Sequence, residues 1–275
     1  MPDRYAVIGH PIAHSKSPTI HAAFARSTGQ DIVYERLLAP LDGFRATVDR
    51  FADEGGKGLN VTIPFKLEAF AVAATVSERA RLAGAVNTLH RTGDAWHADN
   101  TDGAGLVRDV VANLGVDLRG KPIAILGAGG AVRGILKPLL DAGVASVTVA
   151  NRTMAKAAEI AAQFARYGRV EAVAPDALRP HPVVINATSL GMGGAAVDVF
   201  PFDGRVVAPG AFACDLIYSD TETAFMRWAR EHGAARATDG LGMLVEQAAE
   251  SFALWRGVRP DTRSVFALMR PGARA

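Results

Sequence analysis

A polar run at residues 60–66, reading NVTIPFK, places hydrogen-bonding side chains and a lysine beside an expected strand. Asn60 and Thr62 alternate with apolar residues, the last of them Ile63, so one face of the strand should be apolar and the other polar. Lys66 follows at the expected start of a helix. A lysine ammonium in such a place can donate a proton or stabilise negative charge on a substrate oxygen. The alternative is an edge strand with a solvated face and a surface lysine, the commonest environment of lysine.

A second polar run, NTDG at residues 100–103, opens an expected helix over residues 104–114 and is preceded by Asn87 in the run GAVNT. Asp102 supplies the one carboxylate of this second run. Taken alone, Asp102 is interpreted as a helix N-cap, because that is the commonest reason for Asp at a helix start.

A glycine-rich run follows an apolar strand predicted over Ile123–Leu126 and precedes a helix predicted over residues 132–142. Glycines let backbone amides approach a pyrophosphate, and the helix N-terminus adds partial positive charge. The third glycine of the usual fingerprint is replaced by Val132, but the strand before and the helix after meet the context requirement. The run consists of Gly127, Ala128, Gly129, Gly130 and Ala131, and it predicts a dinucleotide site.

The next strand, predicted over Ser146–Ala150, ends where an NAD enzyme commonly carries an acid for the ribose hydroxyls. This chain has Asn151, Arg152 and Thr153 there, with Lys156 one helical turn further on. Two cations and no acid favour NADP over NAD, because a 2′-phosphate would be neutralised by them. The alternative is that Thr153 only caps the helix predicted over residues 154–167, while both cations are solvated.

These runs, taken in order, resemble the shikimate dehydrogenase family along nearly the whole chain. The resemblance implies NADPH-dependent, reversible reduction of 3-dehydroshikimate to shikimate in chorismate and aromatic amino acid biosynthesis, with Lys66 and Asp102 as the catalytic pair. It also implies NADP as cofactor. The matching runs are GHPIAHSKSP (9–18), NVTIPFK (60–66), GAVNT (84–88), NTDG (100–103), GAGGA (127–131), NRT (151–153), NATSLGM (186–192), DLIY (215–218) and DGLGMLVEQAA (239–249).

The resemblance also implies a set of binding residues. The expected substrate contacts are Ser15, Ser17, Asn60, Thr62, Lys66, Asn87, Asp102, Tyr218 and Gln247. The expected cofactor contacts are Gly127, Ala128, Gly129, Gly130, Ala131, Asn151, Arg152, Thr153 and Lys156, with Thr188, Ser189, Ile217, Gly240 and Met243 as further candidates. For the two serines the alternative is a turn and an N-cap before Pro18, and for Met243 it is packing in the core.

Alternating strand and helix patterns predict an α/β fold. We expect an N-terminal α/β substrate domain with a mostly parallel sheet (residues 1–103), a doubly wound Rossmann NADP domain (104–239), and C-terminal helices (240–275) that return to the first domain, as in the family. The expected strands are Tyr5–Ile8, Val33–Leu37, Gly58–Ile63, Thr88–Arg91, Ala95–Ala98, Ile123–Leu126, Ser146–Ala150, Val183–Asn186 and Phe212–Leu216. Further helices are expected over residues 67–75, 241–255 and 262–270, with fraying of 271–275.

Composition is that of an ordinary globular enzyme. The chain has 275 residues, of which 49% are hydrophobic and 21% charged, and a net charge of +2. Scattered basic residues and short apolar runs predict neither nucleic acid nor membrane as a partner, and the absence of a signal peptide predicts a cytoplasmic protein, either monomer or homodimer. Cys214 is the only cysteine and is expected in the core. The histidines lack metal-ligand spacing, so we expect no metal.

Two alternative functions stay open. A quinate/shikimate dehydrogenase would use the same chemistry, although Asn151 in place of an acid disfavours the NAD-using kind. A non-catalytic NADP-binding sensor on the same fold would have no need of Lys66 and Asp102. A folate-linked dehydrogenase is allowed by fold analogy, but the paired serines favour a carboxylate-bearing, hydroxylated ring.

Overall fold

The computed structural model describes residues 1–192, 197 and 200–270, so the expected fraying of 271–275 lies outside the described residues. The chain divides into two compact units. Unit 1 comprises Met1–Gly105 and Val245–Ala275, and unit 2 comprises Leu106–Leu244. The boundaries fall within helices α5 (Asp102–Arg108) and α9 (Leu241–Arg256), so the chain passes from one unit to the other in helical segments.

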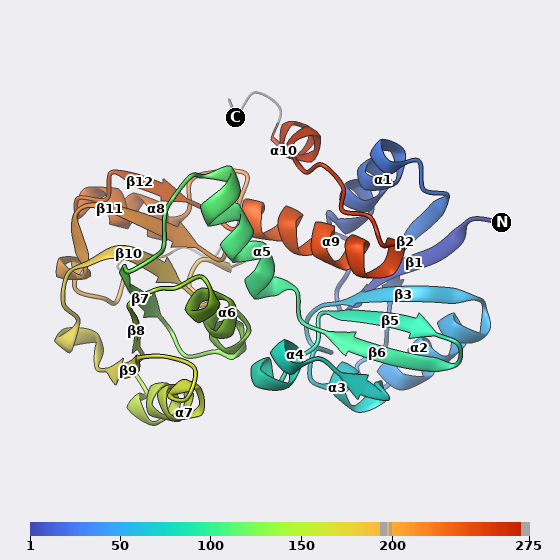
Figure 1. The fold of residues 1–275 in the computed structure, drawn as a ribbon, viewed down its shortest axis with the longest axis horizontal. Coiled ribbons are helices and arrows are strands. Elements are labelled where there is room, and N and C mark those ends of the chain that lie inside the picture. Colours follow the sequence, from blue (N-terminus) through green and yellow to red (C-terminus); the bar gives the residue numbers. More distant parts are fainter. Residues whose placement is uncertain (193–196, 198–199, 271–275) are drawn as a thin grey trace. The chain divides into compact units, whose positions relative to one another are not determined.

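Unit 1 contains a six-stranded sheet of order β2-β1-β3-β5-β6-β4 (Figure 1). Three neighbouring pairs are parallel and two, β3–β5 and β5–β6, are antiparallel, which confirms the prediction of a mostly parallel sheet. The strands are β1 (Asp3–Gly9), β2 (Ile32–Leu38), β3 (Gly56–Val61), β4 (Thr75–Val76), β5 (Thr88–Thr92) and β6 (Ala95–Asp99).

Helices cover both faces of this sheet, and alternate residues of β1 reach the two resulting cores (Figure 1). Ile8 packs in a cluster with Phe44 and Phe51 of α2, whereas Tyr5 stacks on Trp255 of α9 at 4.8 Å. The remaining helices of unit 1 are α1 (Ser17–Thr28), α2 (Phe44–Asp53), α3 (Glu68–Val72), α4 (Glu78–Ala83) and α10 (Arg263–Met269).

Three sequence predictions for unit 1 are wrong in detail. Strand β3 ends at Val61, because its pairing with β5 stops at Asn60 and its pairing with β1 stops at Val61. Ile63 therefore lies beyond the sheet and is 58% exposed rather than buried on an apolar face. Helix α3 ends at Val72, and Thr75 belongs to β4, which pairs with the edge of β6. No helix separates β5 from β6, because Gly93, at a φ of +58°, and Asp94 form a two-residue hairpin loop.

Unit 2 contains a six-stranded, fully parallel sheet of order β12-β11-β10-β7-β8-β9. Numbered from its first strand, β7, this is the strand order 3-2-1-4-5-6 of a Rossmann fold, which confirms the predicted doubly wound domain. Two short strands, β9 and β12, were not predicted, and Cys214 is buried at 1% exposure as expected. The strands are β7 (Pro122–Leu126), β8 (Ser146–Ala150), β9 (Val170–Val173), β10 (His181–Asn186), β11 (Val207–Asp215) and β12 (Arg236–Thr238).

The helices of unit 2 connect successive parallel strands (Figure 1). A π-helical turn over Asp109–Asn113 continues α5, and short 3₁₀ turns span Pro175–Ala177 and Gly204–Val206. The other helices are α6 (Gly130–Asp141), α7 (Met154–Phe164) and α8 (Ala224–Glu231).

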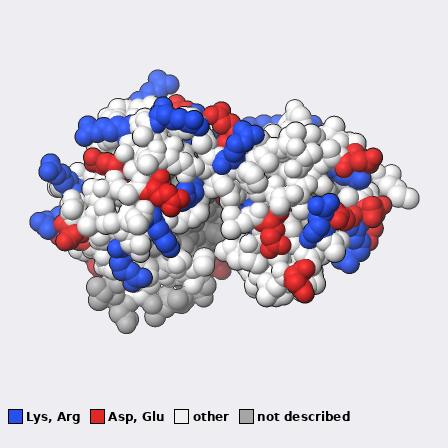
Figure 2. Space-filling view, turned by 90° about the horizontal axis from the view of Figure 1, so that it is seen from below, with Lys and Arg blue, Asp and Glu red and all other residues white. Residues whose placement is uncertain are grey.

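The surface carries both signs of charge. Figure 2 shows Lys and Arg interspersed with Asp and Glu on the visible face. No helix in the described part of the chain is both long and apolar enough to cross a bilayer. Among the same residues, no three His, Cys, Asp or Glu side chains are grouped so as to hold a metal ion.

Candidate active site

Lys66 and Asp102 form an ion pair within unit 1. The Lys66 Nζ donates to Asp102 Oδ2 at 2.7 Å, and the two side chains are 31% and 16% exposed. Lys66 lies in the turn between β3 and α3, where its carbonyl accepts a hydrogen bond from the Val86 amide at 2.9 Å. The alternative of a solvated surface lysine is therefore wrong.

The interpretation of Asp102 as a helix cap is also wrong. Its own amide donates to Asn100 Oδ1 at 3.1 Å, so the Asn100 side chain serves the first turn of α5. The carboxylate of Asp102 is engaged elsewhere, since its Oδ1 accepts from Asn87 Nδ2 at 2.7 Å and its Oδ2 accepts from Lys66. Asp102 thus links the lysine to the polar interior of unit 1.

Asn87, which is 3% exposed, is the centre of that polar interior. Its Nδ2 also donates to Thr101 Oγ1 at 2.9 Å and lies 3.3 Å from Gln247 Oε1. Its Oδ1 accepts from the Thr88 hydroxyl at 2.8 Å and from the Thr101 amide at 2.9 Å. The Thr101 amide can only donate, so the side-chain amide of Asn87 is held in one orientation.

Asn60 connects to the same network. Its Nδ2 donates to Ser251 Oγ at 2.9 Å and to the Asn87 carbonyl at 3.3 Å, while its Oδ1 accepts from the Tyr34 hydroxyl at 2.8 Å. Thr62 lies just past β3, is partly exposed, and has no side-chain hydrogen bond within the described residues. Five of the expected substrate residues, Asn60, Lys66, Asn87, Asp102 and Gln247, are thus joined in one network.

Four members of this network, Tyr34, Thr88, Thr101 and Ser251, are not among the expected site residues. Ser251 follows Gln247 by four residues, so both lie on one face of α9, and that spacing was a usable signal. Thr101 lies inside the NTDG run but was not singled out. Tyr34 had no signal in the sequence, because its partner Asn60 lies on a different strand.

Ser15 and Ser17 form the entry to α1. Ser17 is the first residue of the helix and is 8% exposed, and its amide donates to Ser15 Oγ at 3.3 Å. Arg36 holds the Ser15 carbonyl through Nη2 at 2.6 Å and Nε at 3.1 Å. A turn before the helix is therefore present, but Lys16 rather than a serine occupies the N-cap position.

The glycine run of unit 2 fits a pyrophosphate. Gly127 has a φ of +106°, and a Cβ there would lie 3.0 Å from the Ala187 carbonyl, so only glycine suits this close turn. Gly129 caps α6 without a side-chain hydrogen bond, and a Cβ added at Gly129 or Gly130 would enter open space. The first amides of α6 therefore face a space in which an anion can be bound.

The residues after β8 also fit a phosphate. Asn151 Nδ2 donates to the Thr153 carbonyl at 2.9 Å. Thr153 occupies the N-cap position of α7 but makes no side-chain cap bond, so the capping alternative is wrong and its hydroxyl is free for other use. Arg152 and Lys156 are exposed, and neither has an ion-pair partner within the described residues.

The remaining expected cofactor residues follow the next strands of unit 2. Thr188 and Ser189 follow β10, Ile217 and Tyr218 follow β11, and Gly240 and Met243 lie at the start of α9. A Cβ on Gly240 would lie 2.4 Å from the Leu216 carbonyl, which explains the glycine. Met243 is partly exposed, so it does not belong to the fully buried core.

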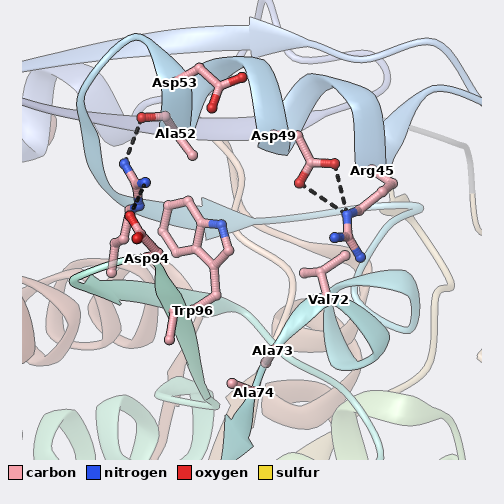
Figure 3. A pocket seen from close by; sticks show the side chains of 11 residues that line it. Arg45, Asp49, Ala52, Asp53, Val72, Ala73, Ala74, Asp94 and Trp96 are labelled. Atoms are coloured by element: carbon pink, nitrogen blue, oxygen red, sulfur yellow. Dashed lines mark hydrogen bonds and ion pairs between the residues drawn. The ribbon is translucent and has the colours of Figure 1, made fainter.

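A pocket of about 530 Å³ in unit 1 lies elsewhere, between α2 and the β5–β6 hairpin (Figure 3). None of the expected site residues is among those that line it. Its arginines are occupied, since Arg45 pairs with Asp49 at 2.9 Å and Arg91 donates to the Ala52 carbonyl at 2.6 Å and pairs with Asp94 at 3.3 Å. We assign no chemistry to it.

Three family models match the chain. Residues 7–89 match the shikimate dehydrogenase substrate binding domain, residues 109–191 match shikimate/quinate 5-dehydrogenase, and residues 240–265 match the shikimate 5′-dehydrogenase C-terminal domain. An NADP(+) shikimate dehydrogenase of Hahella chejuensis is 54% identical over 98% of this chain and 99% of its own length. The chain belongs to the shikimate dehydrogenase family. The predicted resemblance is thereby confirmed.

Solved structures agree with this family assignment. The Ael1 enzyme from Pseudomonas putida is 47% identical, with a TM-score of 0.91 and 98% of each chain covered. Shikimate 5-dehydrogenase from Thermus thermophilus, solved in complex with NADP(H) and shikimate, is 34% identical with a TM-score of 0.85, covering 94% of this chain and 95% of that one.

In this shikimate dehydrogenase family chain, Asp99 anchors the NTDG run from the preceding strand. It accepts two hydrogen bonds from Arg79, at 2.6 and 2.7 Å, and one from the Asn100 amide at 2.7 Å. Arg79 also reaches Glu250 of α9 at 3.1 Å. Burial raises the pKa of Asp99, but the hydrogen bonds and the positive charge of Arg79 outweigh it, so the pKa lies below its usual value.

We predict that Asp99→Asn lowers the free energy of unfolding at pH 7 by about 1–3 kcal/mol, the cost of losing charge-assisted hydrogen bonds. A depressed pKa gives stability that is fully present above the unfolded-state value near 4 and is lost as pH falls through the folded-state value. The difference between wild type and variant should therefore shrink below about pH 4. Urea unfolding at pH 7, 5 and 3 measures it, with the exposed Asp94→Asn as control. A difference that is constant from pH 7 to 3 would contradict the assignment.

Proposed function

We propose that this chain is an NADP-dependent shikimate dehydrogenase that reversibly reduces 3-dehydroshikimate to shikimate in aromatic amino acid biosynthesis. The observation that carries the proposal is the 2.7 Å ion pair of Lys66 and Asp102, whose carboxylate is held by the buried side-chain amide of Asn87, in a chain of this family. The proposal is supported by relatives named NADP(+) shikimate dehydrogenase and by a relative solved in complex with NADP(H) and shikimate.

Lys66 and Asp102 form the proposed catalytic pair. When bound, NADPH supplies the hydride for the ketone carbon. Lys66 then donates a proton to the ketone oxygen, or stabilises the charge that develops there, and the same lysine takes the proton back in the oxidation of shikimate. Asp102 orients the ammonium and accepts a hydrogen bond from a neighbouring substrate hydroxyl.

The other substrate contacts follow from the polar groups of unit 1. Ser15 and Ser17 would hold the substrate carboxylate with neutral hydroxyl donors. Asn60, Thr62 and Asn87 would hold ring hydroxyls together with Asp102, and Gln247 would approach from α9. Tyr218 of unit 2 is proposed as a further substrate contact on the basis of the family resemblance.

NADP is proposed to bind unit 2. The amides of residues 127–131 would hold the pyrophosphate, and Asn151, Arg152, Thr153 and Lys156 would hold the 2′-phosphate and ribose. Thr188, Ser189 and Ile217 follow β10 and β11, and a Rossmann fold binds its ligand at the carboxyl ends of its strands. These residues would lie near the nicotinamide, together with Gly240 and Met243 at the start of α9, which the family resemblance adds. We accordingly assign residues 1–103 to substrate binding and catalysis and 104–239 to NADP binding, with the C-terminal helices (240–275) packing back on the substrate domain.

The proposed setting is the cytoplasm, with small molecules as partners and either a monomer or a homodimer as the working form. The non-catalytic sensor is disfavoured by the Lys66–Asp102 pair, since binding alone needs no proton donor and no carboxylate to orient it. Quinate is expected to be the poorer substrate, because its tetrahedral carbon with an added hydroxyl would have to fit beside Ser15 and Ser17.

The function is tested by following NADPH absorbance with shikimate or quinate and with NADP or NAD. We expect shikimate with NADP to give the highest kcat/KM. An extra hydroxyl without a partner costs about 1–3 kcal/mol, so quinate should be used roughly ten- to a hundredfold less efficiently. Equal kcat/KM for the two acids would assign the chain to the quinate/shikimate dehydrogenases. Absence of turnover with either acid would favour the non-catalytic sensor.

Lys66→Ala should lower kcat by about a hundred- to ten-thousandfold, the usual contribution of a positioned acid or base. The variant should stay folded and bind NADP normally, which thermal unfolding and a cofactor titration would check. Lys57→Ala, at an exposed position of β3, is the matched control and should retain turnover. Near-normal turnover of Lys66→Ala with saturating shikimate would refute the catalytic role.

Arg152→Ala should weaken NADP binding on the order of ten- to a hundredfold, because a charge-assisted contact is worth roughly 1.5–3 kcal/mol. NAD lacks the 2′-phosphate, so its KM should change little. Steady-state kinetics with both cofactors gives the two ratios. Arg166→Ala, at an exposed position just beyond α7, is the control that should change neither. An equal loss for both cofactors would show that Arg152 does not read the 2′-phosphate.

A further inference from the structure

Two buried polar side chains end neighbouring parallel strands of unit 2. Asn186 is the last residue of β10 and Asp215 is the last residue of β11, and the two are register partners. These residues are 0% and 1% exposed, and Asn186 Nδ2 donates to Asp215 Oδ1 at 2.8 Å. The pair therefore lies at the carboxyl ends of the strands, where a Rossmann fold binds its ligand.

The orientation of the Asn186 side chain is fixed by the turn after β10. The Thr188 amide can only donate, and it lies 3.1 Å from Asn186 Oδ1, so Nδ2 must face Asp215. The Thr188 hydroxyl donates to the same Oδ1 at 2.8 Å and accepts from the Leu190 amide at 3.3 Å. Both donors of Thr188 are therefore used within the protein, to close this turn.

Asp215 holds the turn after β11 in a similar way. Its Oδ1 also accepts from the Ile217 amide at 3.1 Å, and the Ile217 carbonyl accepts from the Gly240 amide at 3.0 Å. Three of the proposed nicotinamide contacts, Thr188, Ile217 and Gly240, are thus joined through the Asn186–Asp215 pair. Burial raises the pKa of Asp215, because the charged form is poorly solvated there, and a neutral amide oxygen could accept the same two hydrogen bonds.

We propose that Asn186 and Asp215 are positioning residues that fix the turns after β10 and β11 relative to each other. The proposal rests on the function proposed above. The proposed phosphate contacts follow β7 and β8, so the pair acts on the nicotinamide end of NADP. Hydride transfer needs a precisely placed nicotinamide carbon, and a displacement of about 1 Å costs on the order of a hundredfold in rate. Loss of the pair should therefore lower kcat more than it changes either KM.

Asn186→Asp tests the pair because it places a carboxylate oxygen where Nδ2 donates to Asp215. Two ionised oxygens repel each other at hydrogen-bond distance, so the two turns must move apart or share a proton. We expect kcat per NADP-binding site to fall about ten- to a hundredfold, with the KM values for NADP and shikimate within about threefold of wild type. A calorimetric NADP titration counts the binding sites, so a loss of folded protein is not mistaken for a loss of rate.

A double-mutant cycle with Asp215→Asn shows whether the effect passes through the pair. Asp215→Asn alone should lower kcat by no more than about threefold, since an amide oxygen accepts both hydrogen bonds. In that background the side-chain amide at position 215 can donate to the carboxylate at position 186, so Asn186→Asp should cost less than about fivefold. An equal loss in both backgrounds, or a kcat per site of Asn186→Asp within about twofold of wild type, would overturn the proposal.

Thr188→Val is a second variant, at a partly exposed position, that keeps the protein folded if Asn186→Asp does not. It removes only the hydroxyl that bonds Asn186 and the Leu190 amide. We expect kcat per site to fall about three- to tenfold, the value of one hydrogen bond, without a change in the KM for NADP. Thr188→Ser, which keeps the hydroxyl, should lose less. A raised KM for NADP with unchanged kcat would show that this hydroxyl binds the cofactor directly, against the proposal.

The matched control is Thr148→Val in the same sheet. Thr148 is a buried residue of β8 whose hydroxyl donates to Glu171 at 2.9 Å and lies 3.1 Å from His181, the first residue of β10. The variant loses a buried hydrogen bond at the opposite end of β10 from Asn186, so its Tm should fall while kcat per site is unchanged. A fall in kcat per site equal to that of Thr188→Val would count against a positioning role.

The two proposals fail in different ways. A wild-type protein that neither oxidises shikimate with NADP nor binds NADP in the titration would overturn the proposed function and this positioning role together. A wild-type protein that turns over shikimate, with an Asn186→Asp variant of the same kcat per site, would overturn the positioning role alone.

Discussion

The side-chain amide of Asn87 is the group on which the geometry of the proposed site depends. It is buried, and each of its donors and acceptors has a partner, in Thr88 beside it on β5 and in Thr101 and Asp102 of the NTDG run. A buried polar group left without a partner is costly, so this amide admits one orientation only. Asp102 is held by it, and Lys66 is held by Asp102, so the position of the proposed catalytic ammonium depends on a neutral side chain.

Unit 2 meets the opposite requirement. Its proposed NADP site needs groups without partners in the protein, and these are supplied where β7 ends in the glycine turn at Gly127 and α6 begins without a side-chain cap. Arg152 and Lys156 are likewise exposed, so their charge is available to a phosphate instead of a neighbouring carboxylate. The proposed substrate site of unit 1 is thus fixed by hydrogen bonds within the protein, whereas the proposed phosphate contacts of unit 2 are groups that are available to a ligand.

Both folds and most of the proposed site could be predicted from the sequence, because the motifs are local runs. Lys66 and Asp102 were paired through the family resemblance, and the alternation of strands and helices predicted four of the six strands of the Rossmann half. The short strands β9 and β12 were missed, and β11 begins five residues earlier than expected. Residues whose role depends on another strand or helix could not be found in this way. Tyr34 meets Asn60 only because β2 and β3 flank β1, and Asp102 looks like a cap until Asn100 is seen to serve the helix. Ile63 was predicted to belong to the strand because the alternation of polar and apolar residues continues up to Pro64. The pairing of β3 with β5 stops earlier, at Asn60.

The division of unit 1 into two stretches of sequence has a consequence for how the protein is made. Residues 106–244 leave the ribosome between the two parts of unit 1, so the Rossmann half can be complete while the other half still lacks α9. Until α9 arrives, Asn60 has no Ser251 to bind, the Leu89 carbonyl lacks the Trp255 indole, and Tyr5 has no ring to stack on. The six strands of this sheet all precede residue 100, so a nascent chain exposes one uncovered face of the sheet until α9 is made. The last thirty or so residues decide whether that face is buried or is recognised by chaperones and proteases.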